Sequence, residues 1–206
     1  MSLTPLQRRV VELAYSHRRT HLSSALTAVG LIADIYAERA ERDPFILSCG
    51  HAFLALAVVL EAHYGLTAPD LLARHGVHPR RSEADHIWYT TGSLGCGITA
   101  ACGFAHADRT RRVDCLISDG ECAEPDVFGA LDFARDHALH NLRVHVNLNG
   151  WSAYRSTTDL GLAERLRAFW PPVIIHYTSH ALHPALTGLA GHYHHLSLAE
   201  YQDLLS

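Results

Sequence analysis

"RVDCLISDGECAEPDVFGALDFARDHALHNLRVHVNLNG", residues 112–150, sets the expected architecture of this chain. Apolar runs within 112–120 and 141–150 predict two buried strands, and the segment 124–139 between them predicts a helix. A strand–helix–strand order with apolar strands is typical of a parallel sheet that is covered by helices. We therefore expect an α/β fold with a mainly parallel sheet and helices on both of its faces.

The rest of the chain continues this alternation of helices and strands. Thr4 is the expected N-cap of the first helix, and Pro5 suits its first turn. Gly65 is the expected end of the third helix. Further helices are predicted over 4–19, 23–40, 51–65, 67–76, 162–169 and 197–205, a small-residue segment over 92–109, and a strand over 172–178. No repeat or second domain is evident, so residues 1–206 are expected to form a single domain.

Composition excludes several functional classes. The 206 residues carry a net charge of −4 and contain no lysine, and no basic run suggests a nucleic-acid surface. No apolar stretch is long enough to span a bilayer, and the N-terminus lacks the apolar core of a signal peptide. The five cysteines are scattered and mostly in apolar surroundings, which predicts reduced thiols in a cytoplasmic protein.

Polar residues follow both strands of the 112–150 unit. Asp119-Gly120 ends the first strand, and Asn149 follows the second. Ligands bind beyond the carboxyl ends of strands in such sheets. A carboxylate and an amide carbonyl suit Mg²⁺, which keeps waters and shares its shell with substrate phosphates, and Gly120 lets a phosphate approach the backbone. A single Asp-Gly, however, is more often an ordinary turn.

Asp119-Gly120, followed thirty positions later by Asn149, resembles the Gly-Asp-Gly…Asn motif of thiamine-diphosphate enzymes, with Ser118 in place of the first glycine. More specifically, the chain resembles the N-terminal, diphosphate-binding part of transketolases. Four stretches carry this resemblance in family order: "THLSSALTAVGLIADIY" (20–36), "DPFILSCGHAFLAL" (43–56), "TTGSLGCGITAACGFAHA" (90–107) and "CLISDGECAEPDVFGALDFA" (115–134). The resemblance implies a three-layer thiamine-diphosphate-binding fold.

The resemblance also implies roles for individual residues. The implied Mg²⁺ ligands are the side chains of Asp119 and Asn149 and the backbone carbonyl of Trp151. The implied cofactor-binding residues are His51, Gly92, Ser93, Leu94, Asp119, Gly120, Glu121 and Asn149, although Glu121 could equally cap its helix. The implied catalytic residues are His21, His78, Glu124 and His192.

The histidines near the C-terminus leave the last assignment open. "GHYHHLSLAEYQDLL" (191–205) resembles the end of stand-alone N-terminal subunits, so His192 is the expected last site histidine, with His194 and His195 as alternatives. A zinc site that includes His183 is the other interpretation, but the cluster lacks clean two-pair ligand spacing.

The chain also departs from the family pattern. Glu124-Pro125 stands in place of Glu-Gly, and Phe128-Gly129-Ala130 stands in place of Trp-Glu-Ala, so one family glutamate is missing. The scaffold also looks trimmed near the C-terminus: a helix–strand unit normally found after 162–169 is absent, and "TSHALH" (178–183) replaces a Thr-x-Lys-Gly-x-Gly turn.

The implied activity is ketol transfer, in which a two-carbon unit passes from a ketose-type donor to an aldehyde acceptor with thiamine diphosphate and Mg²⁺ as cofactors. Near-neutral histidines would move hydroxyl protons in this reaction. A separate pyrimidine-binding subunit is expected to complete the enzyme, in an α2β2-like assembly that binds neither nucleic acid nor membrane. Two alternatives remain: a related thiamine-diphosphate carbon–carbon ligase of secondary metabolism, and a non-catalytic paralogue that stabilises a partner.

Overall fold

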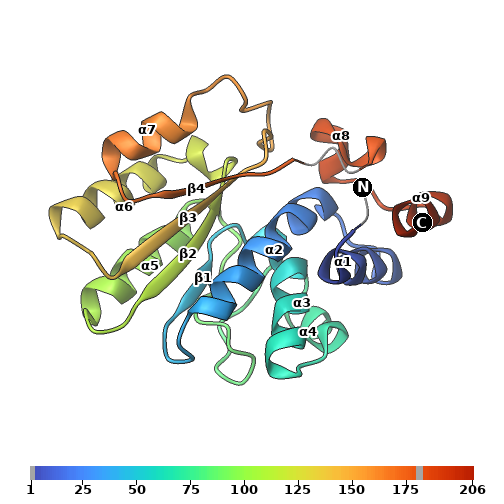
Figure 1. The fold of residues 1–206 in the computed structure, drawn as a ribbon, viewed down its shortest axis with the longest axis horizontal. Helices are drawn as coiled ribbons and strands as arrows, with labels where there is room; N and C mark the ends of the chain where they lie inside the picture. The colour runs from blue at the N-terminus through green and yellow to red at the C-terminus, as the bar shows by residue number, and fades with distance from the viewer. Residues whose placement is uncertain (1–2, 180–182) are drawn as a thin grey trace.

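The computed structural model describes residues 3–179 and 183–206. Within these residues a parallel sheet has the strand order β1-β2-β3-β4, and Figure 1 shows it at the centre of the fold. The strands are β1 (Phe45–Leu47), β2 (Val113–Ser118), β3 (Leu142–Leu148) and β4 (Ile174–Tyr177). The predicted parallel α/β architecture is thereby confirmed.

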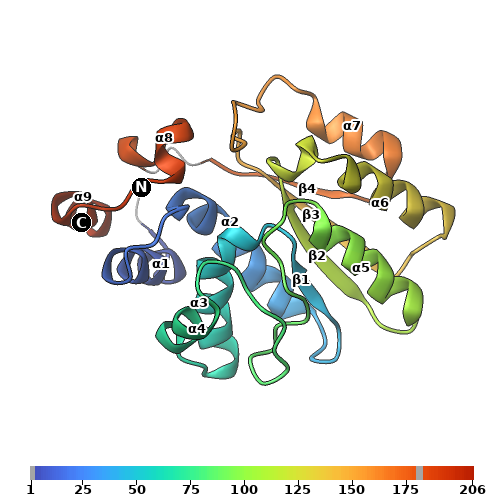
Figure 2. The same cartoon turned by 180° about the vertical axis from the view of Figure 1, so that it is seen from behind.

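Helices pack on both faces of this sheet, which gives three layers (Figures 1 and 2). One face meets a core that includes residues of α1 (Pro5–Ser16), α2 (Leu22–Glu38), α3 (Phe53–Tyr64) and α4 (Ala68–His75). The other face meets α5 (Cys96–Ala107), α6 (Pro125–Asp136) and α7 (Leu162–Phe169). In the described parts of the chain, we find no helix with the length and hydropathy needed to cross a membrane.

Strand β2 shows why the two cores are separate. Val113, Cys115 and Ile117 pack into the core with α5 and α6, whereas Leu116 packs into the core with α2 and α3. Successive side chains of a strand point to opposite faces of its sheet, so an apolar strand joins both cores. The sheet is thus buried on both sides along β2.

The predicted start of α1 and the predicted end of α3 are both confirmed. Thr4 caps α1 in a capping box with Gln7, and Pro5 is the first helical residue. Gly65 ends α3 with a φ of 71°, a conformation that glycine adopts without strain.

Two elements of the fold were not evident from the sequence pattern. Strand β1 was not expected: its three residues are too few to show a strand period, and pairing with β2 makes them extended. Helix α8 (Gly188–His192) was also not expected, and it packs against α2. The expected helix α9 (Leu198–Leu205) packs against α1. Part of the "TSHALH" turn, 180–182, lies outside the described residues.

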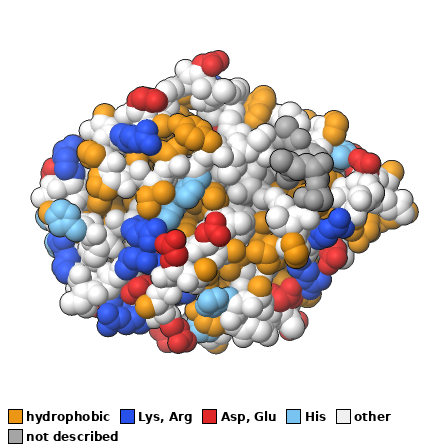
Figure 3. Space-filling view, viewed as in Figure 1, with side chains coloured by type: hydrophobic (Ala, Val, Ile, Leu, Met, Phe, Trp, Pro, Cys, Tyr) orange, Lys and Arg blue, Asp and Glu red, His pale blue; other side chains and the backbone are white. Residues whose placement is uncertain are grey.

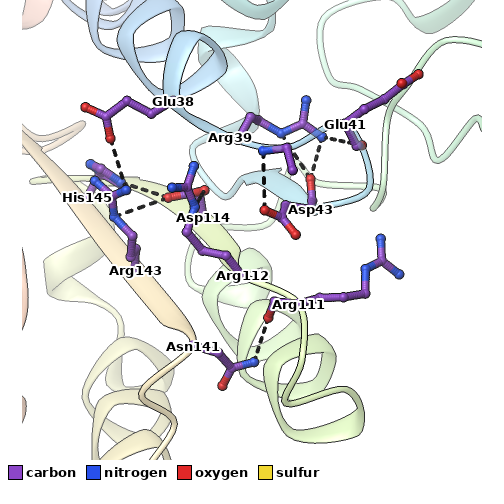
Figure 4. Close-up of polar contacts among 11 residues, drawn as sticks. Glu38, Arg39, Glu41, Asp43, Arg111, Arg112, Asp114, Asn141, Arg143 and His145 are labelled. Atoms are coloured by element: carbon purple, nitrogen blue, oxygen red, sulfur yellow. Dashed lines mark hydrogen bonds and ion pairs between the residues drawn. The ribbon is translucent and has the colours of Figure 1, made fainter.

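A polar network lies near the amino end of β2, on the same side of the sheet as α2. The fully buried Asp114 carboxylate accepts hydrogen bonds from Arg112 Nε at 2.9 Å and His145 Nε2 at 3.2 Å (Figure 4). The other ring nitrogen of His145 lies 3.1 Å from His176 Nε2. Figure 3 shows arginine, acidic and histidine side chains gathered on this face between hydrophobic ones. The opposite, carboxyl end of β2 instead borders a pocket.

Candidate functional site

A pocket of about 170 Å³ lies beyond the carboxyl ends of β1, β2 and β3. We call it the strand-end pocket. Its lining comes from distant parts of the chain: His21, Ser24, His51, His78, Gly92, Leu94, Ser118, Asp119, Gly120, Asn149, Trp151, Ser152, Ala153, His192 and Tyr193. The position agrees with the expected location of ligands in parallel sheets.

Asp119 lines this pocket, and two hydrogen bonds hold its carboxylate. It follows directly after β2, and its Oδ2 accepts hydrogen bonds from the Gly150 N–H and the Thr157 hydroxyl, both at 2.8 Å. Its Oδ1 is buried and has no hydrogen-bond partner among the described residues. Burial raises the pKa of this carboxyl above its ordinary value. A buried carboxylate oxygen without a partner is costly unless a ligand satisfies it, which makes Oδ1 a candidate metal ligand.

Asn149 and Trp151 lie in the loop after β3 and reach the same pocket. Asn149 Oδ1 accepts a hydrogen bond from the Trp151 N–H at 3.0 Å. The hydrogen bond from Gly150 to Asp119 joins this loop to the end of β2. The structure therefore brings together the three residues predicted as Mg²⁺ ligands, whose oxygens are of the type that Mg²⁺ prefers.

Four histidines share the pocket with these oxygens. The ring centroid of His21 lies 5.4 Å from that of His51 and 6.0 Å from that of His192. His78 faces the small-residue loop, residues 92–95, because a Cβ placed on Gly92 would lie 3.3 Å from the His78 ring. All four predicted histidines thus line one pocket, although they come from four separate segments.

Two of these histidines are neutral at physiological pH. Burial lowers the pKa of His21 to about 4, and the nearby His192 and His78 contribute to the same shift. Burial also lowers the pKa of His51 to about 3, with smaller contributions from the other pocket histidines. A neutral imidazole can both donate and accept a hydrogen bond, so these rings can bind a polar ligand group without adding a positive charge to the pocket.

The small-residue loop is fixed by very close backbone packing. A Cβ at Gly50 would lie 2.8 Å from Thr91 Oγ1 and 2.9 Å from the Gly92 nitrogen. A Cβ at Gly97 would lie only 2.5 Å from Ser48 Cα. The segment that leads from β1 to His51 therefore packs directly against the loop that precedes α5.

Three predicted site residues do not line the pocket. Glu121 is fully buried and hydrogen-bonds to Ser48, Gly95 and Ser118. Ser93 is exposed, unlike its neighbours Gly92 and Leu94. Glu124 precedes α6, and its Cβ lies 3.2 Å from the Cβ position of Gly95.

The alternatives at the C-terminus are also separated in space. His192 is buried in the pocket, with Nδ1 3.3 Å from the Gly188 carbonyl oxygen. His194 Nε2 instead lies 2.9 Å from a Glu200 oxygen, and His183 pairs with Asp203. Over 3–179 and 183–206, no three His, Cys, Asp or Glu residues form a metal-binding group, which gives the zinc interpretation no support.

The pocket also contains residues that sequence reasoning missed: Ser24, Ser118, Ser152, Ala153 and Tyr193. Ser24 lies one helical turn after His21, a spacing that would have placed both on one face of α2. Tyr193 follows His192, and its ring centroid lies 5.2 Å from that of His21. Ser152 and Ala153 carried no comparable signal because they lie in an irregular loop without a periodic sequence pattern.

Comparison with known families matches residues 31–124 to the family described as "Transketolase, thiamine diphosphate binding domain". The chain is 37% identical over 122 residues to transketolase-like protein 2 of Bos taurus, covering 53% of this chain and 19% of that protein. It is 27% identical over 184 residues to a subunit of the apulose-4-phosphate transketolase of Phocaeicola vulgatus, covering 80% of this chain and 65% of that protein.

Solved structures show the same fold. A transketolase variant from Pichia stipitis matches with a TM-score of 0.67 at 24% identity, covering 80% of this chain and 29% of that chain. Transketolase from Leishmania mexicana matches with a TM-score of 0.64 at 21% identity, covering 84% of this chain and 35% of that chain. The sequence alignments thus span about a fifth of the transketolase-like relative and just under two thirds of the apulose-4-phosphate transketolase relative.

Proposed function

We propose that this chain, whose residues 31–124 match the thiamine diphosphate binding domain of the transketolase family, is the diphosphate-binding subunit of a two-component, Mg²⁺-dependent ketol-transferring enzyme. The observation that supports the proposal most strongly is the strand-end pocket. Asp119, Asn149 and Trp151 converge there with four histidines, although these residues are spread over most of the chain.

The donor set fits Mg²⁺ bound to a diphosphate. Asp119 Oδ1 is a buried oxygen without a partner among the described residues, and the loop of Asn149 and Trp151 lies beside it. The described lining contains no arginine or lysine, and His21 and His51 are neutral. The negative charge of a diphosphate in this pocket therefore needs a metal cation, which Asp119 and Asn149 would hold together with the Trp151 carbonyl. His51, Gly92, Leu94 and Gly120 would contact the diphosphate end of the cofactor.

Thiamine diphosphate supplies, when bound, a thiazolium ring that accepts the electron pair of a broken carbon–carbon bond. The chain's own part is to bind the diphosphate end and to manage substrate protons. His21, His78 and His192 would hydrogen-bond to substrate hydroxyls and move their protons, because the two ring nitrogens of a histidine can take donor and acceptor roles. A ketose-type donor and an aldehyde acceptor are the substrates we propose.

A second subunit would complete this site. The pocket of about 170 Å³ is smaller than the several hundred Å³ typical of pockets that enclose a whole small-molecule ligand. It suits one end of an extended cofactor. The similarity to a protein named as one subunit of a transketolase supports a partner that covers the other end. We propose an α2β2 assembly in which residues 1–206 form one diphosphate-binding domain and Glu124 lies near the subunit contact. Five free cysteines, four of them buried, are consistent with a cytoplasmic location.

A reconstitution assay tests this function. The purified chain would be incubated with thiamine diphosphate, Mg²⁺, a panel of ketoses with and without phosphate, and aldoses, in the presence and absence of a candidate pyrimidine-binding subunit. Two-carbon transfer that requires both subunits is the expected result. Turnover by the purified chain alone would overturn the two-component proposal, and no transfer with any partner while the cofactor binds would overturn the ketol-transfer assignment.

A further inference from the structure

Glu121 occupies a position that its neighbourhood in the sequence does not explain. It lies two residues after Asp119, yet it is absent from the pocket lining and its exposed fraction is 0%. Every hydrogen bond described for its carboxylate comes from a different segment or from the end of β2. The residue is thus buried behind the pocket wall, where it cannot contact a ligand in the pocket directly.

The Glu121 carboxylate connects three segments. Its Oε1 accepts hydrogen bonds from the Ser48 hydroxyl at 2.5 Å and from the Gly95 N–H at 3.0 Å. Its Oε2 accepts from the Ser118 N–H at 3.1 Å. The Ser48 oxygen in turn accepts from the Ile98 N–H, in the first turn of α5, at 3.1 Å.

Each connected segment carries pocket residues a short distance along the chain. Ser48 is three residues before His51, and Gly95 directly follows Leu94. Ser118 directly precedes Asp119. Loss or lengthening of any of these hydrogen bonds would displace a pocket residue, because the packing at Gly50 and Gly97 leaves no space for an alternative arrangement of the segments.

We infer that Glu121 is a positioning residue that sets the distance between the small-residue loop, the His51 turn and the Asp119 strand end, and so determines how tightly the diphosphate end of the cofactor is bound. The identity of the ligand in this inference rests on the proposed function. The positioning of the three segments by Glu121 does not, because it is a property of the chain without ligand. A carboxylate is required because an amide side chain offers only one acceptor oxygen to these donors.

The chain offers a matched control for this role. Asp114 is a second carboxylate with 0% exposure, and it lies near the other end of the same strand, β2. Its partners are Arg112 and His145, which do not line the pocket. Asp114→Asn therefore removes a buried charge from β2 without touching the three connected segments.

The test measures amide hydrogen exchange by NMR and cofactor binding by calorimetry in the full chain. In Glu121→Gln, exchange at Gly95 and Ser118, relative to Val144 in the core of β3, should rise at least tenfold, and the affinity for thiamine diphosphate with Mg²⁺ should fall roughly tenfold to hundredfold. Ser48→Ala should raise exchange at Ile98 and weaken binding in the same direction. Asp114→Asn should change neither relative exchange nor affinity by more than about twofold.

The outcomes that overturn the positioning role of Glu121 differ from the outcome that overturns the proposed function. Unchanged exchange at Gly95 and Ser118 in folded Glu121→Gln would overturn the positioning role whether or not the cofactor binds. Faster exchange with unchanged affinity would also overturn it, because the loop position would then not matter for binding. If the wild-type chain binds no thiamine diphosphate even with the candidate pyrimidine-binding subunit present, the proposed function fails, and the exchange comparison alone decides whether Glu121 positions the three segments.

Discussion

The backbone N–H of His21 donates a hydrogen bond of 2.7 Å to the carbonyl oxygen of His192. This bond joins the residue that precedes α2 to the last residue of α8, so two pocket histidines from opposite ends of the chain are held together by their main chains. His21 adopts a left-handed conformation with a φ of 57°, which is uncommon for a residue with a side chain. Strain of this kind is concentrated at functional sites.

The pocket histidines should divide into two classes by their kinetic effects. His21→Ala and His78→Ala should lower turnover in the reconstituted enzyme more than they lower cofactor affinity, because their proposed partners are substrate hydroxyls. His51→Ala should instead raise the cofactor concentration needed for half-maximal activity. Steady-state kinetics and calorimetry on the three variants would separate the effects, and wild-type kinetics in all of them would contradict the assignment.

Protonation of the buried histidines should destabilise the chain at acidic pH. The pKa of His51 is about 3 in the fold, against 6.5 for an unperturbed histidine. Between those values the unfolded chain binds more protons than the folded one, so the stability from this group is complete above pH 6.5 and is lost as the pH falls. The slope for one such group is about 1.4 kcal/mol per pH unit.

Urea unfolding at a series of pH values would measure this effect. His51→Gln should reduce the decline in unfolding free energy between pH 6.5 and about 4, relative to wild type. The His86→Gln variant is a suitable comparison because His86 lies outside the pocket, stacked on Tyr64. Parallel pH profiles for wild type and His51→Gln would show that His51 is not held neutral in the fold.

Close packing between Ser48 and α5 should make Gly97 intolerant of a methyl group. A Cβ at Gly97 would lie 2.5 Å from Ser48 Cα, so Gly97→Ala should destabilise the chain by about 1–3 kcal/mol. Gly103 lies on the same helix, and a Cβ placed there would have nothing within 4 Å, so Gly103→Ala should stabilise the chain by roughly 0.5–1 kcal/mol. Equal unfolding free energies for the two variants would contradict the packing described here.

These findings also show which features the sequence could predict. The long helices, β2 and β3 were predictable because their apolar stretches are long enough to indicate a helix or a buried strand. Strand β1 was not, since only pairing with β2 makes Phe45–Leu47 extended. The spacing of Asp119 and Asn149 was informative because parallel strands end at one edge of the sheet.

The position of Glu121 could not be predicted from the same reasoning. The family resemblance implied a cofactor contact for Glu121, with a helix cap as the alternative, but Ser48 and Gly95 approach it from distant segments. Residues that act through such long-range contacts leave no local pattern. Likewise, the presence of Tyr193 in the pocket depends on the contact between α8 and α2.

Metal-dependent cofactor binding is the property that the proposed Mg²⁺ site requires most directly. Isothermal titration calorimetry would measure thiamine diphosphate binding to the full chain with Mg²⁺ and with a chelator, for wild type, Asp119→Asn and the Asp114→Asn control. We expect binding by wild type and Asp114→Asn only when Mg²⁺ is present, and none by Asp119→Asn, which keeps the side-chain shape but lacks the charge that holds the metal. Equal affinity for wild type and folded Asp119→Asn, or affinity that is unchanged by the chelator, would contradict the proposed Mg²⁺ site.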